Sequence, residues 1–140
     1  IDFTTNYSQP DPSAYLALSN DVDLAGGVIA AQSNTIQSGY IATTSATLVE
    51  FSTPEETLAA VRNGEADAVL ADKSFLAPIA AENADLMLVG DNIMLGGGVG
   101  MGIRESDGEL KDKFSAAIDS MKADGSLNAL ITKWEIGETF

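Results

Sequence analysis

Short apolar runs alternate with segments of helical character along most of the chain. The runs Ala14–Leu18 (AYLAL) and Ala66–Ala71 (ADAVLA) have the length of buried strands. The stretch Thr53–Glu56 offers a helix a hydroxyl cap, an early proline and acidic side chains, and Asn63–Gly64 ends that helix. This alternation predicts an α/β fold with an open, largely parallel, Rossmann-like sheet flanked by helices, followed by two C-terminal helices. The expected strands are residues 14–18, 28–31, 48–51, 66–71 and 86–89, and the expected helices are residues 35–43, 54–63, 73–84, 108–123 and 126–135.

The charge balance limits the partners that the chain can bind. Its 140 residues include 21 acidic and 7 basic side chains, which gives a net charge of −14. Because nucleic acids bind to basic surfaces, we expect no nucleic-acid partner. The content of 45% hydrophobic and 20% charged residues is typical of a globular domain.

The chain contains neither cysteine nor histidine. Thiol chemistry, zinc sites made of these residues and a histidine general base are therefore excluded. The pair Asp21 and Asp23 lacks the ligand spacing of a calcium loop. We expect no metal site, no cofactor and no catalytic residue.

The first candidate site is the turn Gln32–Gln37, where the apolar run Val28–Ala31 ends and a helix is expected to begin. In open α/β sheets, ligands bind beyond the carboxyl ends of the strands. The first amides of a helix lack intrahelical partners and favour an anion. Because Asn34 or Thr35 could also cap the helix, the turn is either a ligand site or only a helix start.

The second candidate site is Asp72, which follows the expected strand Ala66–Ala71. A carboxylate at this end of a strand faces the same edge of the sheet as the turn Gln32–Gln37, and it would suit a ligand ammonium group. The alternative is that Asp72 caps the helix that starts at Lys73. The predicted fold places both candidates at one edge of the sheet.

A glycine-rich segment, Gly96–Ile103 (GGGVGMGI), follows an irregular connection at Asp91–Leu95. The segment lacks the Lys-Ser or Lys-Thr pair and the helix that follow a phosphate-binding loop. We interpret it as an extended strand whose backbone freedom is consistent with a hinge.

Seven segments of the chain, taken in order, carry a resemblance to a known family. They are Ile1–Tyr7 (IDFTTNY), Ala14–Leu18 (AYLAL), Val28–Tyr40 (VIAAQSNTIQSGY), Glu65–Asp72 (EADAVLAD), Gly97–Arg104 (GGVGMGIR), Glu109–Gly125 and Leu130–Trp134 (LITKW). Their order and composition resemble type II periplasmic solute-binding proteins of the polar amino-acid class. Members of that class are the extracytoplasmic receptors of ABC importers.

The resemblance implies roles for single residues. Asp72 matches the acceptor for the α-ammonium group of the ligand, and Thr35 and Ile36 match the helix-start positions whose amides meet the α-carboxylate. Ile36 replaces the usual threonine, so only its amide remains for this contact. Gln32 and Ala71 match positions that face the ligand side chain. The candidate ligand-binding residues are Gln32, Asn34, Thr35, Ile36, Gln37, Ala71 and Asp72.

The resemblance also implies a division of the chain. Residues 1–18 match the end of a first lobe and the first hinge strand at 14–18, and residues 19–97 match a second α/β lobe. Residues 98–104 match the returning hinge strand, and residues 105–140 match C-terminal helices that pack on the first lobe. Because the match begins late in the family's sequence, without the first lobe and its clamping arginine, we expect a fragment or an isolated domain that binds weakly alone.

The implied function is the periplasmic solute-binding component of an ABC importer. Such a protein closes two lobes on a small polar amino acid and delivers it to a membrane permease. Two alternatives are a sensor domain of a membrane receptor and a dehydratase-like enzyme with Asp72 or Glu65 as its base. Because Phe114, Leu130 and Trp134 supply more apolar surface than one small sheet needs, we also expect self-association.

Overall fold

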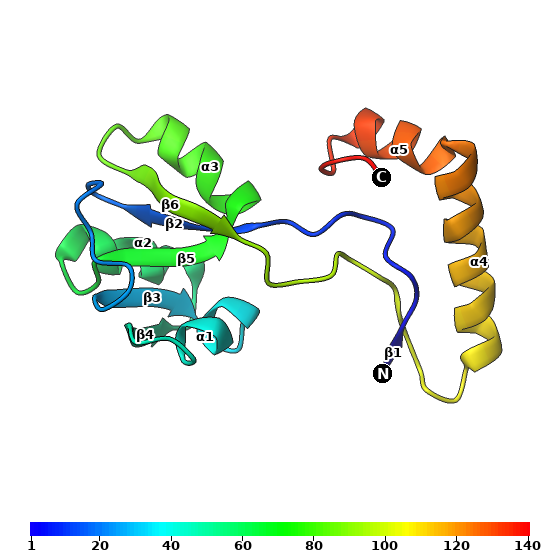
Figure 1. Cartoon of the computed structure of the whole chain (residues 1–140), viewed down its shortest axis with the longest axis horizontal. Helices are drawn as coiled ribbons and strands as arrows, with labels where there is room; N and C mark the ends of the chain where they lie inside the picture. The colour runs from blue at the N-terminus through cyan, green and yellow to red at the C-terminus, as the bar shows by residue number, and fades with distance from the viewer. The chain divides into compact units, whose positions relative to one another are not determined.

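The chain forms two compact units (Figure 1). The computed structural model describes all 140 residues. The helical unit comprises Ile1–Asp11 and Gly97–Phe140, and the sheet unit comprises Pro12–Gly96. None of the helices combines the length and the apolar character that a membrane crossing needs.

The sheet unit contains a five-stranded sheet in the order β4-β3-β5-β2-β6. Strand β3 pairs in parallel with β4 and with β5, whereas β2 pairs antiparallel with β5 and with β6. Because β2 alone runs against its neighbours, the other strands share one direction, and the expected largely parallel α/β fold is confirmed. The strands are β2 (Ser13–Ala17), β3 (Val28–Gln32), β4 (Thr47–Phe51), β5 (Ala68–Asp72) and β6 (Met87–Ile93).

Helices cover both faces of this sheet (Figure 1). Successive side chains of a strand point to opposite faces. On β2, Leu16 belongs to the same buried cluster as Val61 of α2 and Leu76 of α3. The preceding residue, Tyr15, belongs to a second cluster with Ile41 of α1. The helices of this unit are α1 (Ile36–Ile41), α2 (Pro54–Asn63) and α3 (Lys73–Glu82).

Helix α2 begins and ends at the residues that the sequence predicts. The Thr53 hydroxyl accepts a hydrogen bond from the amide of Glu56 at 3.3 Å, and the Glu56 carboxylate accepts one from the amide of Thr53 at 3.0 Å. This reciprocal pair satisfies amides that have no partner within the helix. Gly64 ends the helix in the left-handed region, with φ of 75°.

Strands β2 and β6 differ from the sequence-based expectation. Strand β6 continues to Ile93, although an irregular connection was expected at residues 91–95. The irregularity is instead a register shift between Ser13 and Tyr15, which lets β6 follow β2 to its first residue. The expected hinge strand at residues 14–18 lies inside the sheet, because β2 is hydrogen-bonded to β5 and β6 on its two edges.

The helical unit ends in two helices, as predicted. Its small core contains Ile118, Leu127 and Ile131. Gly125 separates the two helices and has φ of 80°, a conformation that glycine adopts without steric cost. The elements of this unit are β1 (Asp2–Phe3), β7 (Gly102–Ile103), α4 (Gly108–Asp124) and α5 (Ser126–Trp134), and β1 pairs antiparallel with β7.

The glycine-rich segment is not a continuous strand. Strand pairing is confined to Gly102–Ile103 and to an isolated bridge between Ser8 and Val99. The expectation of an extended strand over residues 96–103 is therefore met only in part.

Close approach of two backbones explains these glycines. A β-carbon at Gly98 would lie 2.4 Å from the carbonyl oxygen of Ser8, and one at Gly100 would lie 2.8 Å from that of Thr4. Gly98 also has φ of 93°. The glycines thus allow residues 96–103 to pass against the N-terminal segment, and this contact replaces a regular ladder.

Candidate functional site

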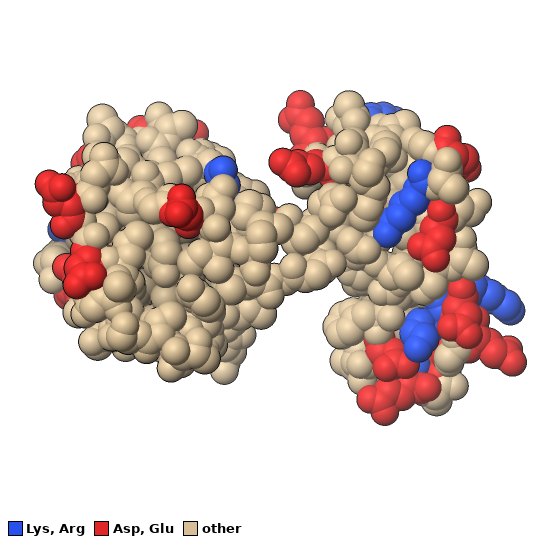
Figure 2. Space-filling model, in the orientation of Figure 1, with Lys and Arg blue, Asp and Glu red and all other residues tan.

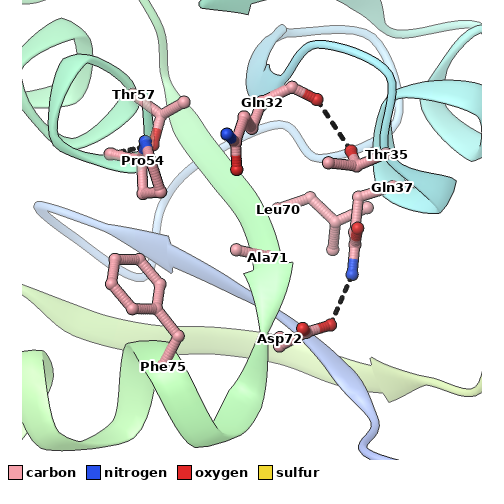
Figure 3. Close-up of a pocket in the computed structure, with 9 residues that line it drawn as sticks. All are labelled: Gln32, Thr35, Gln37, Pro54, Thr57, Leu70, Ala71, Asp72 and Phe75. Carbon is pink, nitrogen blue, oxygen red and sulfur yellow. Dashed lines mark hydrogen bonds between the residues drawn. The ribbon is translucent and has the colours of Figure 1, made fainter. Parts of the chain in front are cut away.

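A pocket of about 150 Å³ opens in the sheet unit at the carboxyl ends of β3 and β5 (Figure 3). The turn before α1 and the first turns of α2 and α3 contribute side chains to it. Complete small-molecule sites usually enclose about 300–1,000 Å³, so this pocket is small for a whole site. Its lining consists of Gln32, Thr35, Gln37, Pro54, Thr57, Leu70, Ala71, Asp72 and Phe75.

Asp72 is the only charged residue in this lining. Although it directly precedes α3, its side chain makes no capping hydrogen bond to that helix. None of the ion pairs in the structure includes Asp72. Its carboxylate accepts a hydrogen bond from the side-chain amide of Gln37, at 2.6 Å. The structure thus shows no helix-capping role for the Asp72 side chain.

Gln37 reaches Asp72 from the first turn of α1 (Figure 3). Its side chain is buried, with 6% of the residue exposed. The Nε2 atom donates to Asp72 Oδ1 and also to Ser13 Oγ, the second bond at 3.0 Å. The three residues come from different elements: β5 ends at this edge of the sheet, whereas β2 and α1 begin there.

The turn before α1 acts as a helix cap. Thr35 Oγ1 accepts a hydrogen bond from the amide of Ser38 at 3.2 Å and donates one to the carbonyl oxygen of Gln32 at 2.7 Å. Asn34 adopts the left-handed conformation with φ of 61°, which asparagine tolerates better than most residues. The Thr35 hydroxyl is therefore engaged within the turn.

Amides at the start of α1 remain unbonded. The backbone N–H groups of Ile36 and Gln37, the first two residues of α1, make no hydrogen bond within the chain. The side chain of Ile36 is 57% exposed and does not line the pocket. Ile36 therefore has only its backbone N–H, and not its side chain, to offer a ligand here.

Gln32 and Ala71 also line the pocket. Gln32 ends β3, and its Nε2 atom donates to the carbonyl oxygen of Ser52 at 3.1 Å, which ties β3 to the loop before α2. Ala71, the penultimate residue of β5, is partly exposed in the lining. The pocket thus brings together five of the seven candidate residues, and Asn34 and Ile36 are outside its lining.

Four lining residues were not predicted from the sequence: Pro54, Thr57, Leu70 and Phe75. Pro54 and Thr57 lie in the first turn of α2, where the Thr57 hydroxyl donates to the Pro54 carbonyl oxygen at 2.6 Å. Phe75 lies in the first turn of α3. The available signal was positional, because helices that follow parallel strands begin at the same edge of the sheet.

The sheet unit is thus an α/β domain with a pocket at the carboxyl ends of its parallel strands. The sequence profile of the bacterial extracellular solute-binding proteins, family 3, matches residues 1–138. The chain belongs to this family, and the resemblance found in the sequence is confirmed.

Two curated relatives are named for arginine binding. The arginine-binding periplasmic protein of Mannheimia haemolytica is 27% identical over 136 residues, which cover 92% of this chain and 57% of that protein. A putative ABC transporter arginine-binding protein 2 of Escherichia coli K12 is 30% identical over 78 residues, which cover 53% of this chain and 32% of that protein. The match thus spans little more than half the length of the first relative and about a third of the second.

Solved structures share the fold. A periplasmic His/Glu/Gln/Arg/opine family-binding protein from Silicibacter pomeroyi, in complex with lysine, superposes with a TM-score of 0.83 at 65% identity, over 96% of this chain and 62% of that one. An arginine transport periplasmic binding protein from Legionella pneumophila, at 20% identity and a TM-score of 0.75, shares the fold over 94% of this chain and 64% of that one. The fold is therefore that of the type II periplasmic binding proteins.

Proposed function

We propose that the sheet unit is the ligand-binding lobe of a periplasmic solute-binding component of an ABC importer, and that it binds a polar amino acid. The partners of the whole protein are then an amino acid and the membrane permease that receives it. The relatives named for arginine and the neighbour bound to lysine make basic amino acids the first ligands to test.

The observation that carries this proposal is the state of Asp72. Its carboxylate lines the pocket without an ion pair and without capping α3. A carboxylate without a cationic partner suits an ammonium group, because a hydrogen bond between two charged groups is stronger than one between neutral groups. Asp72 is therefore our candidate for the partner of the ligand's α-ammonium group.

The unbonded amides of Ile36 and Gln37 are our candidates for the α-carboxylate. An amino acid carries both charges on neighbouring atoms, so its ligand site needs an acceptor and donors close together. Here β5 supplies the acceptor and the turn after β3 supplies the donors, and these parallel strands are direct neighbours in the sheet. Gln32, Thr35 and Ala71 complete the proposed site.

An enzymatic role has less support. The matched family consists of solute-binding proteins. Glu65, the second acid considered as a base, is outside the pocket lining. Asp72 is then the only carboxylate in the pocket, so no acid–base pair is present there.

Replacing Asp72 by Asn tests the proposal. Truncating one partner of a buried hydrogen-bonded charge pair costs about 2–5 kcal/mol. With the bound ligand covering Asp72, we therefore expect the Asp72→Asn variant to bind its amino acid about 30-fold more weakly. Isothermal titration calorimetry of the full-length gene product with L-lysine, L-arginine and L-glutamine measures the change.

Asp91→Asn is the matched control, because Asp91 is an exposed acid of the same unit outside the pocket lining. We expect this variant to bind like the wild type. Absence of amino-acid binding by the wild type, or equal binding by the Asp72→Asn variant, would overturn the proposal.

A further inference from the structure

Gln37 holds the pocket carboxylate in place without carrying a charge. A carboxylate only accepts hydrogen bonds, so the Gln37 side chain must turn its NH₂ group toward Asp72. Gln37 Nε2 lies 2.6 Å from Asp72 Oδ1, so the amide is in direct hydrogen-bond contact with the carboxylate. We propose that Gln37 is a positioning residue that orients Asp72 for the ammonium group of the ligand.

A second bond fixes the amide itself. Gln37 Nε2 also donates to Ser13 Oγ at 3.0 Å, and Ser13 is only 1% exposed. Ser13 and Asp72 are direct partners in the β2–β5 register, so their side chains stand next to each other at the end of the sheet. The two acceptors together match the two hydrogens of the Gln37 amide, so the side chain is tied at two points.

The neutrality of Gln37 has a consequence for binding. A lysine or arginine in its place would orient Asp72 equally well, but its positive charge would cancel the attraction of the carboxylate for an ammonium group. An amide donor fixes the geometry and leaves the full negative charge for the ligand. Because the amide uses Oδ1, the other carboxylate oxygen stays available to the pocket.

Gln37 does not cap α1, so helix capping does not explain why its side chain is buried. The cap of α1 is Thr35, whose hydroxyl accepts from the amide of Ser38. The remaining alternative is a direct contact between the Gln37 side chain and the ligand, since this residue also lines the pocket. A double-mutant cycle with Asp72 separates the two roles, because only a residue that acts through Asp72 loses its effect when Asp72 is replaced.

This inference rests on the proposed function, and one titration series tests both. The proteins are the full-length gene product and its Gln37→Leu, Asp72→Asn and doubly substituted variants, titrated with L-lysine. Leucine keeps the bulk of the buried side chain and removes its donor. We expect Gln37→Leu to weaken binding about tenfold, near the lower end for a hydrogen bond to a charged group, and to have no further effect in the Asp72→Asn background.

The second part of the experiment uses a ligand that lacks the α-ammonium group. 6-Aminohexanoate retains the carboxylate and the side-chain ammonium of lysine, so we expect Gln37→Leu to leave its affinity unchanged. Ser13→Ala is the second variant, for the case in which Gln37→Leu fails to fold. Ser13→Ala leaves Gln37 with Asp72 as its one acceptor. We expect this variant to lose about threefold in affinity for lysine and none in affinity for 6-aminohexanoate.

The outcomes are distinguishable. If the wild type binds none of the amino acids, the proposed function fails, and this inference fails with it. If the wild type binds and Asp72→Asn weakens binding, the proposed function stands by itself. Equal losses from Gln37→Leu in both Asp72 backgrounds, or equal losses for lysine and 6-aminohexanoate, would then overturn the positioning role and assign Gln37 a direct or purely structural one.

Discussion

Tyr15 is the only ionisable side chain among the buried residues of the sheet unit. It lies in the centre of β2 and belongs to the cluster that α1 covers. Burial raises the pKa of the Tyr15 phenol above its usual value of 10.0, and the nearby Tyr40 adds to this shift. The folded state therefore disfavours the ionised phenolate more than the unfolded state does.

This shift predicts a change of stability in alkali. A raised pKa in the folded state contributes stability that is complete below the unfolded-state pKa and is lost as the pH rises through the folded-state pKa. We therefore expect the free energy of unfolding to fall above about pH 10, and to fall less in a Tyr15→Phe variant. Urea unfolding at about pH 7 and at about pH 11 measures the difference, and an equal alkaline loss in both proteins would contradict it.

At the scale of elements, features that depend on residues close in sequence were predicted better than features that depend on pairing between distant strands. The capping box of Thr53 and Glu56 and the stop at Gly64 involve residues close in sequence, and the structure contains all of them where the sequence indicates. The direction of β2 and the extension of β6 to Ile93 depend on pairing between distant strands, which a single sequence does not encode locally. The contact of Gln37 with Ser13 was missed for the same reason, since it depends on where β2 enters the sheet.

The role of the glycine-rich segment, residues 96–103, also depends on a contact between residues distant in sequence. Its composition excluded a phosphate-binding loop, but the reason for its glycines is a contact with residues near the N-terminus, such as Ser8. Gly98 and Gly97 provide a matched pair of positions, because a β-carbon at Gly97 would meet nothing within 4 Å.

We expect Gly98→Ala to destabilise the helical unit by about 1–2 kcal/mol from the positive φ alone, with the clash against the Ser8 carbonyl in addition. Gly97→Ala should be neutral or slightly stabilising, because it restricts the unfolded chain without a clash. Amide hydrogen exchange of Thr4 and Tyr7, which donate to the carbonyl oxygens of Met101 and Val99, reports directly on this contact. Equal exchange rates in the two variants would contradict the close-approach explanation.

At the scale of the whole molecule, apolar surface is concentrated on the helical unit. Phe114 of α4 is 39% exposed, and Leu130 and Trp134 of α5 are 41% and 65% exposed. On the face seen in Figure 2, this unit also carries both acidic and basic side chains. The unit's buried core is small, with Ile118, Leu127 and Ile131 as its buried members.

Exposed apolar side chains on two adjacent helices predict that the 140-residue chain self-associates through α4 and α5. We expect its sedimentation coefficient to rise with protein concentration, because burial of this surface gains about 25 cal/mol per Å². Leu130→Asp should weaken the association at least about tenfold, since a charge would be buried in the contact. Met94→Asp is the matched control, because Met94 is 59% exposed but belongs to the sheet unit. A sedimentation coefficient that is independent of concentration, or equal effects of the two substitutions, would contradict association through these helices.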